Sequence, residues 1–140
     1  MKIAYIITSL ANSGPIIVVQ DLVHLLVEAG HECTVFYFDE KKDLNFPCPT
    51  ERISFRTKIN FKAFDVIHCH GFRPDLFVLL HKPLFCKTKV FSTIHSYMFQ
   101  DHKFKYGLFK SKIYPRLVFA SQLRSDKIIV LSKDALNYYS

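Results

Sequence analysis

The sequence contains no tryptophan, and it has only four glycines, two methionines and four cysteines among its 140 residues. The cysteines, Cys33, Cys48, Cys69 and Cys86, form no CxxC pair. No secretory signal precedes them, so we expect reduced thiols in a cytoplasmic protein. No apolar run approaches the roughly 20 residues that a membrane-spanning helix requires. These absences argue against a disulfide-stabilised secreted domain and against a transmembrane protein.

Several motifs of common catalytic and phosphate-binding sites are missing as well. Neither GxGxxG nor GxxxxGKS/T follows the first apolar run, so the sequence has no dinucleotide or P-loop fingerprint. No GxSxG nucleophile elbow is present. The carboxylates Asp65, Asp75, Asp101 and Asp126 form no obvious pair at the spacing of a hydrolase. The sequence therefore predicts neither a serine-hydrolase site nor a paired-carboxylate site.

What is present fits one globular domain with a single hydrophobic core. Hydrophobic residues make up 49% of the chain, which is ordinary for a folded domain and argues against disorder. The formal net charge of +7 indicates anionic partners such as nucleic acid, acidic lipid head groups or phosphorylated substrates. Charge alone does not choose among them.

Apolar runs alternate with helical patterns along the chain. The runs predict buried parallel strands at residues 2–8, 32–38, 65–70, 89–95 and 127–131, with a short strand or two within 52–61. Helices are predicted at residues 16–29, 73–81 and about 114–123. The polar residues of 16–29 are few and fall mostly on one narrow stripe, so we expect this helix to be mostly buried. The alternation predicts an α/β fold, a Rossmann-like parallel sheet with helices on both faces.

Ligands of open α/β sheets bind beyond the carboxyl ends of the strands. The segments expected at that edge are residues 8–14, 39, 68–71, 95–97 and 132. Gly14 lies at the mouth of a helix that Asn12 or Ser13 can cap, where backbone N–H groups and the helix dipole suit a phosphate or carboxylate. The alternative is a tight turn before a capped helix.

Three histidines come from this predicted edge. His68 and His70 are two residues apart on a strand, so both point to one face. They could bind a metal with Cys33 or Cys69, but no further ligand follows at a recognised spacing. We favour one histidine in the core and one in the cleft. His95 could donate a hydrogen bond to a sugar hydroxyl or a developing charge, or it could be a structural histidine at a strand end.

A basic and aromatic segment without acidic residues runs from residue 102 to residue 124. Its first five cationic residues are Lys103, Lys105, Lys110, Lys112 and Arg116, and they alternate with phenylalanine and tyrosine. This mixture suits an anionic membrane surface, where rings lie at the interface and charges meet phosphates. A solvated basic face with its rings in the core is the equal alternative, and binding of single-stranded nucleic acid is a weaker one.

Four segments, in order and at plausible separations, resemble the N-terminal domain of family 4 glycosyltransferases. They are MKIAYIITSL…SGP…VVQDLVHLLVEAGHECTVF, DVIHCHG, FSTIH and IIVLS, and they span nearly the whole chain. The resemblance implies a GT-B enzyme with two Rossmann-like domains facing a cleft, no metal requirement and retention at the anomeric carbon. It also implies that the N-terminal domain mainly holds the acceptor.

The resemblance implies roles for individual residues. Ser13–Gly14 matches a loop near the donor phosphates and sugar, although the family often has two glycines, so Ser13 is a departure. His95 matches a histidine near the transferred sugar and is the expected catalytic residue. Ser132 matches the serine after the last strand of the half-domain. The residues expected to line the acceptor side of the cleft are His70, Ser96, Tyr97 and Ser132.

Residues 1–140 lack the family's C-terminal domain, which supplies the groups that grip the nucleotide-sugar donor. We therefore expect an incomplete GT-B half whose isolated chain has little turnover, because stabilisation of the leaving group is usually the largest catalytic contribution. The donor is a substrate, so no cofactor or metal is expected. The acceptor is expected to be a saccharide or a lipid-linked saccharide destined for cell-surface polysaccharide, reached from the cytoplasmic membrane face.

Two other interpretations of the sequence stay open at this point. One is a non-catalytic Rossmann-like module that binds an anionic membrane surface or a glycan. The other is a metal- or phosphate-dependent hydrolase that uses His68, His70 and His95.

Overall fold

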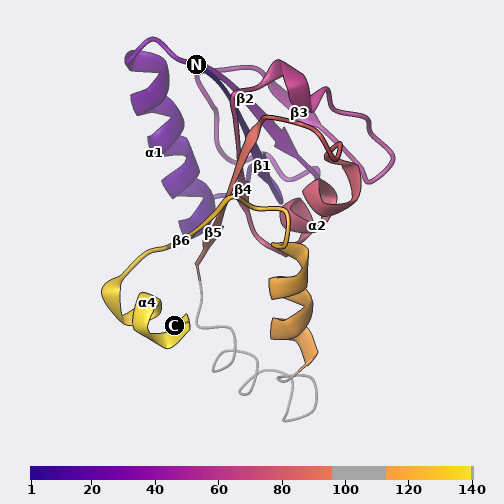
Figure 1. Ribbon diagram of the computed structural model, residues 1–140. Coiled ribbons are helices and arrows are strands. Elements are labelled where there is room, and N and C mark those ends of the chain that lie inside the picture. The colour runs from indigo at the N-terminus through magenta and orange to yellow at the C-terminus, as the bar shows by residue number, and fades with distance from the viewer. Residues whose placement is uncertain (96–112, 140) are drawn as a thin grey trace.

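The computed structural model describes residues 1–95 and 113–139, and within them the chain forms a six-stranded, all-parallel sheet (Figure 1). The strand order is β3-β2-β1-β4-β5-β6. The strands are β1 Lys2–Ile7, β2 Glu32–Tyr37, β3 Thr50–Arg52, β4 Val66–His70, β5 Lys89–Ile94 and β6 Lys127–Val130. The helices are α1 Gly14–Glu28, η1 Phe61–Ala63, α2 Phe72–His81, residues 113–121 and α4 Lys133–Tyr139. The predicted α/β sheet and its principal strands are confirmed.

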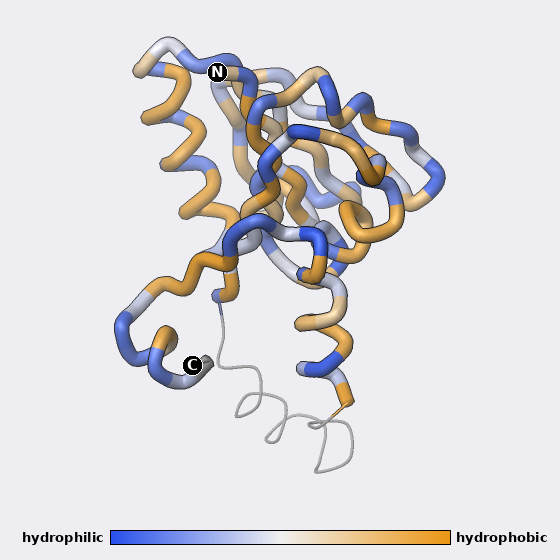
Figure 2. The backbone as a smooth tube through the Cα atoms, in the orientation of Figure 1, coloured by the Kyte–Doolittle hydropathy of each residue, from blue (hydrophilic) through white to orange (hydrophobic). Residues whose placement is uncertain are grey.

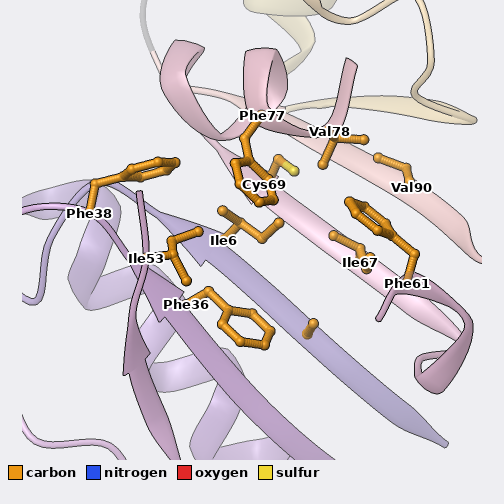
Figure 3. Close-up of a cluster of buried hydrophobic side chains, with 11 residues drawn as sticks. Ile6, Phe36, Phe38, Ile53, Phe61, Ile67, Cys69, Phe77, Val78 and Val90 are labelled. Carbon is orange, nitrogen blue, oxygen red and sulfur yellow. The ribbon is translucent and has the colours of Figure 1, made fainter. Parts of the chain in front are cut away.

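Strand β1 is buried on both faces, as its continuous apolar run predicts. Ile3, Tyr5 and Ile7 pack in the cluster that contains α1, whereas Ala4 and Ile6 pack in the cluster that contains α2. Successive side chains of a strand point to opposite faces, so one run fills two cores. Figure 3 shows the cluster on the α2 side, where phenylalanines from several elements surround Ile6.

Helix α1 begins after Ser13 and ends before Gly30, which has a φ of 86°. The expectation that α1 is mostly buried is wrong. Only Ile16, Val19 and Val23 are buried, while several other apolar side chains of the helix are exposed. A helix that packs against one face of a sheet buries one stripe of its surface, and apolar residues outside that stripe stay in solvent.

Strand β6 is a second correction, because its apolar run predicts a strand buried on both faces. Lys127–Val130 pairs with β5 at the edge of the described sheet. Ile128 and Ile129 are 47% and 36% exposed. Apolar composition identifies a strand but does not reveal its place in the sheet. The short strand or two predicted within 52–61 are not found there: β3 ends at Arg52, and residues 53–60 contain no strand.

Gly71 is the N-cap of α2 and has a backbone conformation, φ 105° and ψ 169°, that only glycine adopts readily. A Cβ there would lie 3.7 Å from Thr8 Cγ2, an ordinary contact, so the backbone and not crowding requires glycine. A Cβ at Gly14 would meet nothing within 4 Å.

We expect Gly71→Ala to lower the free energy of unfolding by about 1–3 kcal/mol, because alanine is strained in this conformation. Gly14→Ala is the matched control and is expected to change stability little, or to raise it slightly through lower entropy of the unfolded chain. Urea unfolding of both variants measures the difference. Equal stabilities of the two variants would contradict the assigned role of Gly71.

Candidate functional site

A cleft of about 290 Å³ lies at the carboxyl edge of the sheet. The chain leaves β1 and β4, which are neighbours, toward helices α1 and α2 in the two separate core clusters. Such a divergence is the usual ligand-binding position of an open α/β sheet. The cleft is lined by the loop after β1, the first turn of α1, the start of α2, the end of β5 and residues 114–122. A cleft therefore lies at the edge of the sheet where the sequence predicts the site.

The loop between β1 and α1 forms one wall, and the segment after β2 holds it in place. The Asn12 N–H donates to Asp43 Oδ2 at 3.1 Å, and the Leu10 N–H donates to the Lys41 carbonyl at 3.0 Å. Ser13 lines the cleft and is the N-cap of α1, but its hydroxyl makes no capping hydrogen bond.

The first turn of α1 offers fewer amide donors than a typical helix start. The Ser13 carbonyl accepts the N–H groups of Ile16 and Ile17 at 3.0 and 2.9 Å, and Pro15 has no N–H. In the part of the chain that the structure describes, the Gly14 N–H has no backbone acceptor. An anion at this position would meet one free amide and the positive end of the helix dipole.

Histidines and one threonine form the floor of the cleft. His70 Nδ1 lies 2.7 Å from His95 Nε2, and His68 Nε2 lies 2.7 Å from Thr93 Oγ1. The rings of His68 and His70 have centroids 4.3 Å apart, which confirms that both point to the same face of β4. Tyr5 from β1 packs on His68 with a centroid distance of 5.2 Å. His70, Thr93 and His95 line the cleft.

The cleft floor is uncharged at neutral pH. Burial, with a smaller contribution from the other two histidines, lowers the pKa of His70 to about 2. Burial, and then His95, lowers the pKa of His68 to about 4, and burial also lowers the pKa of His95. A neutral imidazole has one N–H donor and one acceptor. This floor therefore suits hydroxyl groups better than charged groups.

The sequence analysis missed a second polar group in the cleft wall, formed by Asp75, Ser92 and Gln122. The Ser92 hydroxyl and the Gln122 amide donate to Asp75 Oδ2 at 2.8 and 3.1 Å, and the same amide nitrogen lies 2.9 Å from Ser92 Oγ. All three side chains are buried. Burial raises the pKa of Asp75 to about 6, against the opposing effect of the two donors. The available sequence signal was Ser92, a polar residue inside the apolar run of β5, which indicates a buried hydrogen-bond partner.

Three polar atoms in the cleft walls are buried and, among the described residues, have no hydrogen-bond partner. They are His70 Nε2, Asp75 Oδ1 and Gln122 Oε1. Unpaired buried polar atoms are rare because each one costs free energy. Because the three atoms lie around one cleft, this cleft is the candidate functional site.

Other residues proposed for the site are placed differently. The Ser132 hydroxyl accepts the Ala135 N–H at 3.0 Å and so caps α4, and Ser132 is not among the residues that line the cleft. Arg116 is exposed on the helix of residues 113–121. The remaining candidates lie outside the described residues: Ser96, Tyr97, Lys103, Lys105, Lys110 and Lys112.

Neither a metal-ion cluster nor a membrane-spanning helix occurs within the described ranges 1–95 and 113–139. In these ranges, no group of three or more His, Cys, Asp or Glu side chains is arranged to hold a metal ion. Likewise, no helix there combines the length and the apolar character needed to cross a bilayer. All four cysteines are free thiols.

The family described as Glycosyltransferase Family 4 matches residues 13–140 of the chain. Two curated proteins of Escherichia coli, both described as O-antigen biosynthesis glycosyltransferase WclY, are each 41% identical to it over 145 residues. These alignments cover 99% of this chain and 41% of each relative. The chain thus spans about two fifths of the length of the curated relatives it matches.

A solved structure with a similar fold is described as alpha-glucosyltransferase in complex with UDP and a 13-mer DNA containing a central A:G mismatch. The TM-score is 0.60 and the sequence identity is 13%. The superposition covers 96% of this chain and 38% of the other. The likeness shows the shared Rossmann-like fold of a GT-B glycosyltransferase half, with helices on both faces of the sheet.

We expect Asp75→Asn to gain stability relative to wild type as pH rises from about 4 to above 6. The pKa of this carboxyl is about 6 in the folded chain and 3.8 as its ordinary value. The folded state therefore binds the proton more tightly, and wild type loses stability while the carboxylate ionises. The relative gain should be on the order of 3 kcal/mol.

Urea unfolding of both proteins across this pH range measures the effect. Shifts of the histidines cancel in the difference because both proteins contain them. Asp21→Asn, at an exposed position of α1, is the matched control. Its free energy of unfolding should change with pH in the same way as that of wild type. If the free energies of unfolding of wild type and Asp75→Asn change with pH in the same way, the raised pKa of Asp75 is ruled out.

Proposed function

The chain belongs to Glycosyltransferase Family 4, and from this premise we propose that it is the acceptor-side domain of an enzyme that transfers a sugar from a nucleotide-sugar to a saccharide acceptor. The observation that carries the proposal is the cleft at the switch point of the sheet, whose floor of neutral histidines offers hydrogen-bonding groups without charge. Neutral imidazoles and buried amide and carboxyl groups match the hydroxyls of a sugar ring, which are neutral donors and acceptors.

We propose that the donor is held mainly by a second α/β domain that faces this cleft, with net retention at the anomeric carbon. The part of this chain that contributes to binding of the donor is then the Ser13–Gly14 turn. It offers one free amide and the positive end of the α1 dipole, which suits one phosphate oxygen. A single amide is too little to neutralise a leaving diphosphate, and this supports the proposal that the isolated chain has little or no turnover.

His95 is the proposed catalytic residue because its half-buried ring lies at the end of β5 and lines the cleft. The hydrogen bond from or to His70 fixes the ring, and His70 is itself fixed by burial. A fixed neutral imidazole can donate to a hydroxyl of the transferred sugar or to the charge that develops during transfer, without reorganisation at the moment of reaction. No metal ion or cofactor enters this proposal.

The proposed acceptor is a saccharide of cell-surface polysaccharide synthesis, carried on a lipid. The description of the two relatives as O-antigen biosynthesis enzymes supports this class. The proposed location is the cytoplasmic face of the membrane, which the net charge of +7 supports because anionic head groups attract basic proteins.

His95→Ala is expected to lower the rate of transfer at least about tenfold, the size of one lost transition-state hydrogen bond. The measurement is the initial rate of transfer from a panel of labelled UDP-, GDP- and dTDP-sugars to membrane-extracted lipid-linked saccharide. It uses the protein that carries this chain together with its donor-binding domain. His24→Ala, an exposed histidine of α1, should transfer at the wild-type rate. Wild-type kinetics of His95→Ala would refute the catalytic role.

Gly14→Val is expected to weaken donor binding and slow transfer, because the branched side chain blocks close approach of the donor to the backbone. The open space around Gly14 means that valine does not clash with the described residues, so the change tests ligand approach and not folding. The assay compares KM for the donor with kcat, and a thermal melt checks the fold. If both constants stay unchanged in a folded variant, the loop is only a turn.

A further inference from the structure

The loop between α2 and β5 lies at the amino edge of the sheet, opposite the cleft. Strand β5 begins at Lys89, and the Lys89 N–H donates to the carbonyl of Asp65, the residue before β4. We propose that this loop, residues 82–88, docks the protein on an anionic lipid bilayer. The proposal concerns a surface separate from the cleft, and it uses none of the basic residues between 103 and 116 that the sequence analysis singled out.

The tip of the loop consists of two adjacent, exposed hydrophobic side chains. Leu84 is 85% exposed and Phe85 is 95% exposed, the highest values of any large hydrophobic residue that the structure describes. In Figure 2 the loop is a hydrophobic stretch between hydrophilic residues. Single apolar residues on a surface are ordinary, but two neighbours extended fully into water indicate a surface that is covered in the working protein.

Two lysines lie near Phe85 of this tip. Lys62 and Lys87 line, together with Phe85, a hollow of about 460 Å³. Asp65 also lines the hollow, and its carboxylate accepts the Lys2 backbone N–H at 2.7 Å. Among the described residues, no carboxylate lies within ion-pair distance of Lys62 or Lys87. Both ammonium groups are therefore available to phosphate oxygens.

Other cationic side chains near the loop, those of Lys82, Lys89 and Arg124, form ion pairs or hydrogen bonds within the protein and stabilise the loop. Lys82 and Lys89 both pair with Asp126, at 3.7 and 3.3 Å. The Arg124 guanidinium donates to the carbonyl groups of Lys82 and Pro83, the latter at 2.8 Å. These contacts fix the first half of the loop to the segment before β6.

The second half of the loop is fixed by Thr88. Its buried hydroxyl lies 2.7 Å from the Phe61 carbonyl, to which it donates, and the Cys86 thiol lies 3.3 Å from the same hydroxyl. With both ends held, the backbone that presents Leu84 and Phe85 is fixed, so little backbone entropy is lost when a partner covers them.

A lipid surface matches this arrangement better than another protein does. In a bilayer the apolar layer lies directly beneath a layer of phosphates, and here Phe85 of the apolar tip lines the same hollow as Lys62 and Lys87. A stable protein interface needs roughly 800 Å² from each partner, far more than two side chains and two lysines supply. The same geometry gives nucleic acid no row of stacking rings.

The test is flotation of the full 140-residue chain with vesicles of phosphatidylglycerol and phosphatidylcholine. We expect binding that falls as ionic strength rises, and no binding to pure phosphatidylcholine. Leu84→Ser/Phe85→Ser should weaken binding at least about tenfold. Lys62→Glu/Lys87→Glu should weaken it similarly and reduce its dependence on salt.

Two double variants serve as matched controls. Leu25→Ser/Leu136→Ser removes two exposed leucines outside the loop, and Lys41→Glu/Lys133→Glu makes the same charge change at the opposite edge. Both should bind vesicles like wild type. The proposal is overturned if wild type does not bind anionic vesicles or if folded loop variants bind like wild type. It is also overturned if the control variants lose as much vesicle binding as the loop variants do. No sugar donor or acceptor is present, so the outcome is independent of glycosyl transfer.

Discussion

Strand β1 is hydrogen-bonded to β2 on one side and to β4 on the other, and both of its faces are buried. A shift of register by one residue would move Tyr5 into the α2 core and Ile6 into the α1 core. The pairing of β1 with β4 also brings together two strands that continue toward helices in different cores. The cleft at the carboxyl ends of β1 and β4 follows from this one pairing. The same pairing explains why Ser13, after β1, and His70, at the end of β4, line one cleft.

The polar side chains of the cleft are paired with one another instead of with ions. On one face of β4 and β5 the partners are imidazole and hydroxyl groups, and on the other face Ser92 faces the carboxyl of Asp75 and the amide of Gln122. Burying isolated charges would cost far more than burying the neutral imidazole and hydroxyl pairs. The histidine floor of the cleft can therefore be polar without being charged, which fits recognition of hydroxyl-rich ligands through hydrogen bonds.

The strands that carry the cleft could be predicted because β1, β4 and β5 are short, largely apolar runs, and such runs indicate buried strands. The contact between His70 and His95 could not, because it depends on β4 and β5 being neighbours and in register, and a single sequence does not contain lateral strand order. Asp75 was missed for a related reason. In the sequence it is an acidic residue in the first turn of a helix, and only packing against β5 turns it into a buried group.

The sheet is unevenly supported from its centre to its β6 edge. At the centre, β1 is enclosed by two strands and two cores, whereas β6 pairs with β5 at the edge of the described sheet and has exposed isoleucines. Local opening is easiest where few apolar contacts must be broken. Backbone amides of β6 should therefore exchange with solvent deuterium much sooner than those of β1. The wall of the cleft nearest β1 is therefore expected to be stiffer than the wall built from the end of β5, the strand that pairs with β6, and residues 114–122.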